Sequence, residues 1–279
     1  MVMTAPAPRA DIDPLAPHRV AAQPYYRPSG DEVRWFEAAC SRHLPLLLKG
    51  PTGCGKTRFV EAMAWRMGVP LIQVACNEDT SAADLTGRHL LDGDGTYWAD
   101  GPLTLAARHG AICYLDEIVE ARPDATVVIH PLTDGRRLLP LERNGEVVRA
   151  HRDFHLVISY NPGYQSEHKR LKPSTRQRFV AIDFGYGDAA HEIDIVVRES
   201  GVARDTARRL VDIAQRTRTL ADDGLDEGAS TRLVVQAAQL IAAGLSPLAA
   251  CRLAISAAAT DDADSAAALQ AFAAAHFAE

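Results

Sequence analysis

Short apolar runs alternate with segments of helical periodicity over the first two thirds of the chain. Five of these runs have the length and composition of buried strands: 46–48, 71–76, 111–115, 154–160 and 179–184. Segments such as 31–41 and 58–67 instead repeat apolar residues at helical spacing. This alternation predicts an α/β domain with a five-stranded parallel sheet, whose functional residues lie at the carboxyl edge of the strands.

The pattern changes from Asp188 onward, where every periodic segment is helical and glycines separate the segments. The predicted helices are 189–199, 203–218, 230–243, 247–259 and 263–277. We therefore expect an α/β domain over 23–186 and an all-helical domain with an alanine-rich C-terminus over 187–279. Residues 1–22, rich in proline and alanine, are expected to be a disordered leader.

The first apolar run leads directly into a glycine-rich loop before a helix. Eight residues fit the P-loop pattern G-x-x-x-x-G-K-[ST]: Gly50, Pro51, Thr52, Gly53, Cys54, Gly55, Lys56 and Thr57. The glycines allow a tight turn in which backbone N–H groups point at the phosphates of a nucleotide. Lys56 is expected to reach the β- and γ-phosphates, and the Thr57 hydroxyl to bind Mg²⁺. The loop therefore predicts a site for ATP and Mg²⁺.

An acidic pair follows the third apolar run, where we expect a buried strand to end. Asp116 would hold Mg²⁺, directly or through water, and Glu117 would polarise the attacking water. Taken alone, Asp-Glu after an apolar run is often only a solvated loop. Together with Lys56 and Thr57, the pair favours hydrolysis of a nucleoside triphosphate.

Two further residues are candidates for the same site. Asn161 follows the fourth run, where its side chain could position the attacking water; the alternative is that Asn-Pro simply starts a turn. Arg232 falls in the first turn of a helix that Ser230 is expected to cap, where the helix dipole disfavours a cation. We interpret this placement as the sign of an anion, the γ-phosphate of the nucleotide.

Residues 136–150 form an insertion between the third and fourth runs. Strand-like segments at 136–141 and 146–150 flank Arg143-Asn144-Gly145, and Asn-Gly in this setting is a strong hairpin signal. A hairpin that protrudes from a nucleotide hydrolase is a candidate lever or partner contact. A passive surface hairpin fits the sequence equally well.

Composition limits the remaining classes of function. The 279 residues are 47% hydrophobic and 24% charged, as in a soluble globular protein. With 30 basic against 36 acidic residues and no basic run, no direct nucleic-acid partner is expected. The five cysteines are scattered, which indicates reduced thiols in a cytoplasmic protein. The alanine-rich stretch 263–278 is broken by polar residues, so it predicts a helix and no membrane span.

The order of these motifs resembles the MoxR branch of the AAA+ ATPases. Five segments carry the resemblance: 50–57, 113–117, 159–163, 176–179 and 230–232. Within that branch, three phrases are similar to the CbbQ/NirQ/NorQ group: GPTGCGKTRFVE from Gly50, VACNED from Val74 and VISYNPGYQ from Val157. The resemblance covers about residues 25–245.

What the resemblance implies is a homo-hexameric ring that binds ATP and Mg²⁺ between subunits, with the helical part as a lid domain. The residues would then take the family's named roles: Lys56 and Thr57 as Walker A, Asp116 and Glu117 as Walker B, Asn161 as sensor 1 and Arg232 as sensor 2.

The resemblance also implies residues that act across the ring. Arg178 aligns with the arginine finger that is supplied to the neighbouring subunit's site, and Arg176 is the second candidate. The segment 79–88 lies where a pore-facing loop would be. It has no aromatic residue, which disfavours processive threading of a polypeptide.

Members of this group act with a von Willebrand factor A domain partner and remodel or mature a metabolic enzyme. We therefore expect an ATPase that works as a remodelling chaperone. Its client would be Rubisco, as for CbbQ, which we rank slightly ahead, or a nitric oxide or nitrite reductase, as for NirQ and NorQ.

Other classes of function remain as alternatives. One is a nucleotide-gated assembly module, in which ATP binding rather than hydrolysis is the switch. A P-loop metabolite kinase is disfavoured by the acidic pair at 116–117 and by the helical domain that carries Arg232. A DNA motor is disfavoured by the net charge of −6.

Overall fold

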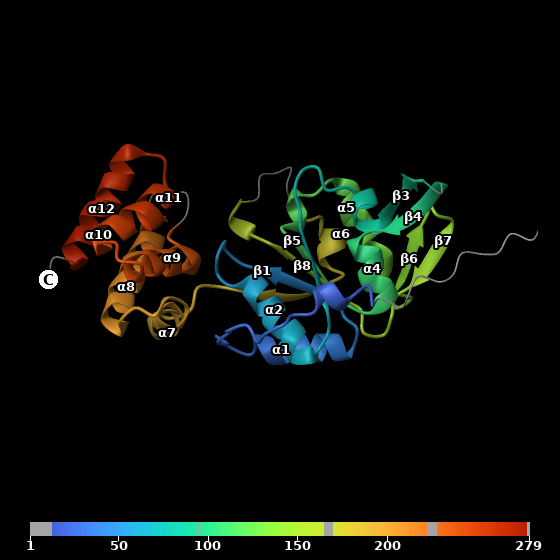
Figure 1. The fold of residues 1–279 in the computed structure, drawn as a ribbon, viewed down its shortest axis with the longest axis horizontal. Coiled ribbons are helices and arrows are strands. Elements are labelled where there is room, and N and C mark those ends of the chain that lie inside the picture. Colours follow the sequence, from blue (N-terminus) through green and yellow to red (C-terminus); the bar gives the residue numbers. More distant parts are fainter. Residues whose placement is uncertain (1–12, 94, 165–169, 222–227, 278–279) are drawn as a thin grey trace, which may run out of the picture. The chain divides into compact units, whose positions relative to one another are not determined.

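A computed structural model describes residues 13–93, 95–164, 170–221 and 228–277 (Figure 1). Contacts divide the chain into two compact units. The first unit comprises Met1–Tyr26, Asp31–Lys49 and Thr57–Asp183. The second comprises Arg27–Gly30, Gly50–Lys56 and Phe184–Glu279, so most of the P-loop groups with the helical part of the chain.

The first unit contains the five-stranded parallel sheet that the sequence predicts. Its strands are β1 (Leu46–Lys49), β2 (Leu71–Ala75), β5 (Ile112–Asp116), β8 (His155–Tyr160) and β9 (Val180–Asp183). They lie in the order β2-β5-β8-β1-β9. Because β5 and β8 are neighbours, the residues at the carboxyl ends of these two strands meet at one edge of the sheet.

Apolar residues cover both faces of the sheet, as a parallel sheet between helices requires. Leu47 and Ile158 are register partners and belong to the core that includes α4 (Pro102–His109) and α5 (Pro123–Val128). The opposite face packs against α1 (Glu32–Ser41) and α2 (Lys56–Met67), which lie side by side in Figure 1. Between these two helices, the rings of Phe36 and Phe59 meet edge to face, with their centroids 5.3 Å apart.

Two hairpins and several short helices complete the first unit. The predicted insertion forms β6 (Leu138–Leu141) and β7 (Glu146–Arg149), which pair antiparallel. A second hairpin, β3 (Gly87–Asp92) and β4 (Gly95–Asp100), was not predicted. The short helices are α3 (Ala82–Thr86), α6 (Pro173–Arg176), and the 3₁₀ turns Ala16–His18, Ile118–Glu120, His130–Leu132 and Pro162–Tyr164.

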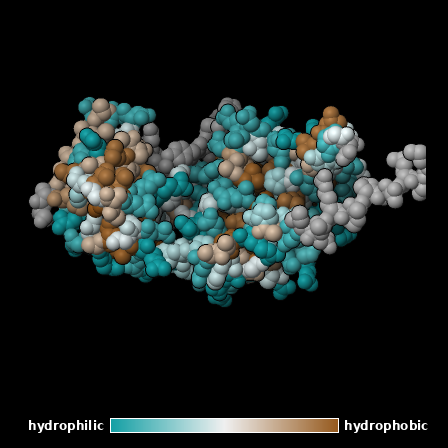
Figure 2. Space-filling view, viewed as in Figure 1, coloured by the Kyte–Doolittle hydropathy of each residue, from teal (hydrophilic) through white to brown (hydrophobic). Residues whose placement is uncertain are grey.

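The segment 79–88, where the resemblance places a pore-facing loop, contains the short helix α3 and the start of β3. A capping box starts α3, because the Ser81 hydroxyl accepts from the Asp84 N–H while the Asp84 carboxylate accepts from the Ser81 N–H. The chain then enters β3. Leu91, on this hairpin, is 81% exposed, and Figure 2 shows a hydrophobic tip over the hairpin.

One arginine ties the two hairpins to α4. The Arg108 guanidinium donates to Glu146 of β7 at 2.6 and 3.0 Å and to Asp100 of β4 at 2.9 Å. The hydrogen bonds to the Glu146 carboxylate hold the pKa of that carboxyl below its usual value.

The second unit is all-helical over its described C-terminal residues, as predicted. Its helices are α7 (Ala189–Ser200), α8 (Arg204–Ala221), α9 (Thr231–Ala242), α10 (Pro247–Cys251), α11 (Ala257–Ala259) and α12 (Ala263–Phe277). The helix expected over 247–259 is interrupted by a π-helical turn at Arg252–Ser256. In this turn the buried Ser256 hydroxyl donates to Gln270 Oε1 of α12 at 3.3 Å.

Part of the expected leader is packed. Residues 1–12 lie outside the described residues, but Leu15 is only 4% exposed and belongs to the core of the first unit. Its N–H donates to Asp13 Oδ1 at 3.0 Å, and a 3₁₀ turn follows at Ala16–His18. Residues 13–18 therefore differ from the disorder expected of them, because one apolar side chain anchors the segment. Among the described residues, no helix has the length and apolar composition needed to cross a bilayer.

The burial of Leu15 generates a test of this anchoring. Leu15→Ala is expected to lower the free energy of unfolding by about 2–4 kcal/mol, because it leaves a cavity in a packed core. Leu91→Ala is the matched control, since Leu91 is 81% exposed and its truncation should change stability by less than about 0.5 kcal/mol. Urea unfolding of both variants measures the difference. Equal, small effects would contradict the packing of the leader.

Candidate active site

The P-loop is a tight turn in which two glycines adopt left-handed backbone angles. Gly53 has φ of +68° and Gly55 φ of +101°. A β-carbon at Gly55 would meet nothing within 4 Å, so the loop is open there. The buried Lys56 folds back onto the loop, and its ammonium donates to the carbonyl oxygens of Gly50 at 2.8 Å and Pro51 at 3.0 Å. These features fit a phosphate-binding loop.

In the first unit, the structure brings together two oxygen-bearing side chains expected to hold Mg²⁺. The Thr57 hydroxyl, in the first turn of α2, donates to Asp116 Oδ2 at 3.1 Å. Mg²⁺ accepts few protein ligands and keeps waters and phosphate oxygens in its shell, so one hydroxyl and one carboxylate fit it. Within the described residues, His, Cys, Asp and Glu form no cluster able to hold a metal by themselves.

The Asp116 carboxylate is held by two hydroxyls that were not among the predicted site residues. Tyr114 OH donates to Asp116 Oδ1 at 2.8 Å, and the Ser159 hydroxyl donates to the same oxygen. Tyr114 and Ser159 are fully buried, and their hydroxyl oxygens are 3.1 Å apart. Burial, followed by the negative charge of Asp116, raises the pKa of Tyr114, so the phenol stays a neutral donor.

A signal for these two residues was present in the strand pattern. Side chains two apart on a strand share a face, which places Tyr114 beside Asp116. Leu115 and Ile158 are register partners in β5 and β8, so Ser159 lies level with Asp116 one step further along. A hydroxyl at each of these buried positions was therefore informative, but only once the strand order was known.

Glu117 and Asn161 also meet in the first unit. Glu117 adopts φ of +52°, a left-handed conformation that is uncommon for a residue with a β-carbon and that recurs at functional sites. Its N–H donates to the Ser159 hydroxyl at 3.3 Å, and its Oε2 accepts from the Asn161 N–H at 3.2 Å. The Asn161 side chain accepts from the Gly163 N–H at 3.0 Å, so the turn that was its alternative role is formed.

Arg176 and Arg178 lie apart from this cluster of hydrogen bonds. Arg176 ends α6, Arg178 follows two residues later, and both side chains are exposed. Neither side chain forms a hydrogen bond or a salt bridge with another described residue. Burial and then the Arg178 charge lower the pKa of His130, whose Nε2 lies 2.9 Å from the Thr175 hydroxyl. Nothing in this geometry separates the two arginines as finger candidates.

Arg232 belongs to the second unit and is exposed in the first turn of α9. Ser230 caps this helix as predicted, because its hydroxyl accepts from the Leu233 N–H at 3.4 Å. A β-carbon added at Gly53 would lie 2.6 Å from Ser230 Oγ and 3.2 Å from Arg232 Cβ. Within this unit, the start of α9 therefore packs directly against the P-loop.

A P-loop, an acidic pair after β5 and a polar residue after β8 define the AAA class of nucleotide-binding proteins. Residues 45–179 match the family described as AAA domain (dynein-related subfamily). Residues 192–276 match the family described as CbbQ/NirQ/NorQ C-terminal.

Relatives that match this chain over most of its length identify the family more closely. Protein CbbQ of Hydrogenophilus thermoluteolus is 62% identical, over 88% of this chain and 92% of that protein. Protein NorQ of Paracoccus denitrificans is 59% identical, over 86% and 89% of the two chains. Denitrification regulatory protein NirQ of Pseudomonas aeruginosa is 57% identical, over 89% and 95%. The chain therefore belongs to the CbbQ/NirQ/NorQ family of AAA+ ATPases.

Solved structures of distant proteins share the fold. NtrX from Brucella abortus, determined in complex with ADP, has a TM-score of 0.53 at 14% identity, over 80% of this chain and 52% of that one. A point mutant of RuvB from Thermotoga maritima has a TM-score of 0.50 at 16% identity, over 88% and 73%. At these identities the likeness shows the AAA+ fold alone.

The position of Ser159 generates a prediction about a residue that was not among the predicted site residues. Ser159→Ala removes the hydroxyl that donates to Asp116 and accepts from the Glu117 N–H. We expect the rate of ATP hydrolysis to fall about 5- to 20-fold, because the Asp116 carboxylate and the Glu117 backbone lose a common support. Ser41→Ala is the control, since that hydroxyl only donates to the carbonyl of Ala38 on the surface. Equal steady-state rates for the two variants would contradict the supporting role of Ser159.

Proposed function

We propose that this protein is an ATP-hydrolysing remodelling chaperone that acts as a homo-hexameric ring. The observation that carries the proposal is a connected set of hydrogen bonds at the carboxyl edge of the sheet. The set joins, in order, Thr57, Asp116, Ser159, Glu117 and Asn161. This set supplies a metal-binding pair and a base whose position is fixed. Membership of the CbbQ/NirQ/NorQ family of ATPases supports the same activity.

In the proposed mechanism, the P-loop binds the phosphates, Asp116 helps to hold the metal ion and Glu117 orients the attacking water. The N–H groups of the loop and Lys56 bind the phosphate oxygens, while Thr57 and Asp116 hold Mg²⁺. When bound, Mg²⁺ neutralises the negative charge that develops on the transferred phosphoryl group. Glu117 accepts a hydrogen bond from the attacking water and orients it, and Asn161 fixes the Glu117 carboxylate through its N–H.

Arginines supply the remaining positive charge in this proposal. Arg232 contacts the γ-phosphate from the start of α9, and Arg178 reaches the site of the neighbouring subunit, with Arg176 as second candidate. The exposure of both finger candidates supports a role across a subunit interface. Residues 23–186 form the motor domain and 187–279 the lid, and hydrolysis moves one against the other.

The proposed client is a metabolic enzyme, recruited with a von Willebrand factor A domain partner in the cytoplasm. Rubisco is ranked first, on the resemblance to CbbQ, and a nitric oxide or nitrite reductase second. The identities of 62% to CbbQ, 59% to NorQ and 57% to NirQ differ too little to decide between the clients. Reactivation of inhibited Rubisco by the purified protein with its partner tests the first-ranked client directly.

The role of Glu117 leads to the first test of the mechanism. Glu117→Gln keeps an oxygen that can accept from the Asn161 N–H but removes the charge that polarises water. We expect ATP to bind with the wild-type Kd while hydrolysis falls about 100-fold or more. Glu120→Gln, the same change three residues along, is the control. Unchanged turnover in Glu117→Gln would overturn its assignment. Client release with a non-hydrolysable ATP analogue would favour the assembly-module alternative.

The trans-acting finger is tested by mixing variants. Arg178→Ala rings are expected to assemble but to hydrolyse ATP about 10³-fold more slowly. Subunits with Lys56→Ala are also expected to be inactive, because they lack the phosphate-binding amine. Mixed rings should regain activity, since an intact finger then faces an intact P-loop at some interfaces. Arg176→Ala serves as the comparison. No recovery on mixing would contradict a finger supplied in trans.

A further inference from the structure

A tyrosine in the segment between β9 and α7 binds the backbone of the P-loop. Tyr186 OH donates to the carbonyl oxygen of Thr52 at 3.0 Å. The same segment also packs closely against the loop at Gly50. A β-carbon added there would lie only 2.4 Å from the Phe184 carbonyl oxygen. The connection that leads into the helices of the second unit is therefore attached to the P-loop itself.

The hydrogen bond to Thr52 sets the direction of a phosphate-binding group. The Thr52 carbonyl and the Gly53 N–H belong to one planar peptide and point in opposite directions. When Tyr186 holds the carbonyl outward, the Gly53 N–H is held toward the inside of the turn, where P-loops collect their donors. Tyr186 thus acts on the backbone of the loop at Thr52.

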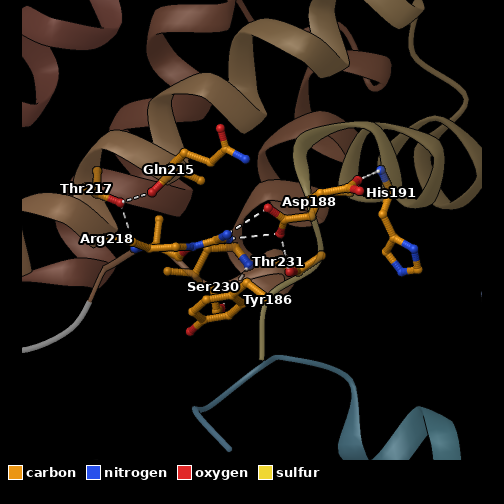
Figure 3. A network of polar contacts seen from close by, with 12 residues as sticks. Tyr186, Asp188, His191, Gln215, Thr217, Arg218, Ser230 and Thr231 are labelled. Carbon is orange, nitrogen blue, oxygen red and sulfur yellow. Dashed lines mark hydrogen bonds and ion pairs between the residues drawn. The ribbon is translucent and has the colours of Figure 1, made fainter. Parts of the chain in front are cut away.

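The ring of Tyr186 is held in turn by the helices. The Arg218 guanidinium of α8 lies over the ring, with Cζ 3.7 Å from the ring centroid (Figure 3). Arg218 also makes a bidentate pair with Glu192 of α7, at 2.7 and 2.9 Å, and donates to the Ala229 carbonyl at 2.8 Å. The Glu192 side chain is 1% exposed, and Arg218 is its buried counter-ion.

The same carboxylate fixes the start of α9. The Thr231 hydroxyl donates to Glu192 Oε1, and the Ala229 N–H donates to the Thr217 hydroxyl at 2.8 Å. Figure 3 shows the Arg218 side chain extended toward Thr231, with the ring of Tyr186 beside it. Arg232 is the next residue along the helix, so its backbone is positioned by the same buried network.

We propose that Tyr186 is a positioning residue that couples the P-loop to the placement of Arg232. The inference rests on the proposed function, because Arg232 is taken to act on the γ-phosphate. A change in the P-loop turns the Thr52 peptide, and the bond to Tyr186 passes this change through Arg218 and Glu192 to the first turn of α9. In reverse, movement of the helices alters the donors of the loop.

The first experiment removes one oxygen. Tyr186→Phe loses the bond to Thr52 and keeps the ring beneath Arg218, so only the link between the loop and the helices is cut. We expect kcat for ATP hydrolysis to fall about three- to tenfold, the effect of one hydrogen bond. Tyr97→Phe, at a half-exposed tyrosine of β4, is the matched control and should leave kcat unchanged. A wild-type kcat in Tyr186→Phe would overturn the inference.

A double-mutant cycle separates positioning from a general structural effect. In an Arg232→Ala background, Tyr186→Phe is expected to change kcat by less than about twofold, because the group it positions is absent. If the two losses multiply, the two residues act independently and the coupling is wrong. Tyr186→Leu, which also removes the ring, should give a larger loss of kcat than Tyr186→Phe in the wild-type background.

Amide hydrogen exchange without nucleotide tests the coupling separately from hydrolysis. Tyr186→Phe is expected to speed exchange at Gly53 and at 231–233, while Tyr97→Phe leaves both unchanged. Exchange that matches wild type at 231–233 would overturn the coupling even if ATP is hydrolysed. A wild-type protein that binds no ATP would instead refute the proposed function, and the exchange result would still decide the link between Tyr186 and α9.

Discussion

The polar contacts of the first unit depend on one carboxylate that must be hydrogen-bonded at the boundary of a packed core. Asp116 ends a strand whose preceding residues are completely buried, and an unpaired charge there would be strongly destabilising. Hydroxyls from three elements satisfy it: Thr57 of α2, Tyr114 of β5 and Ser159 of β8. The need to hydrogen-bond this charge therefore links the helix after the P-loop to the two strands that precede Glu117 and Asn161.

The second unit also buries an acidic side chain, but an arginine rather than a set of hydroxyls pairs with it. Glu192 is buried among helices, where hydroxyls alone would leave its charge without a counter-ion, and Arg218 pairs with it through two hydrogen bonds. Arg218 then stacks on Tyr186, whose hydroxyl binds the P-loop at Thr52. In each unit, one buried or half-buried acidic side chain thus organises a set of polar contacts, and each set reaches the nucleotide-binding sequence.

Much of the fold was predictable because its signals are local. The five apolar runs, the capping serine at Ser230 and the Asn144-Gly145 turn each depend on a few adjacent residues, and all match the structure. The hairpin at 87–100 was missed because its strands alternate poorly and Leu91 points into solvent. The packing of Leu15 was missed for the opposite reason, since one apolar residue in a proline-rich segment gives no periodic signal.

The sequence by itself determined the family, because a P-loop, an acidic pair, an asparagine and an arginine occur with the types and order of an AAA+ ATPase. Only the tertiary structure decided which side chains support them. Tyr114 and Ser159 are 45 residues apart, and Tyr186 is 134 residues from Thr52. Their roles arise from strand order and helix packing. A hydroxyl or a tyrosine has no distinguishing pattern along the chain until folding places it against its partner.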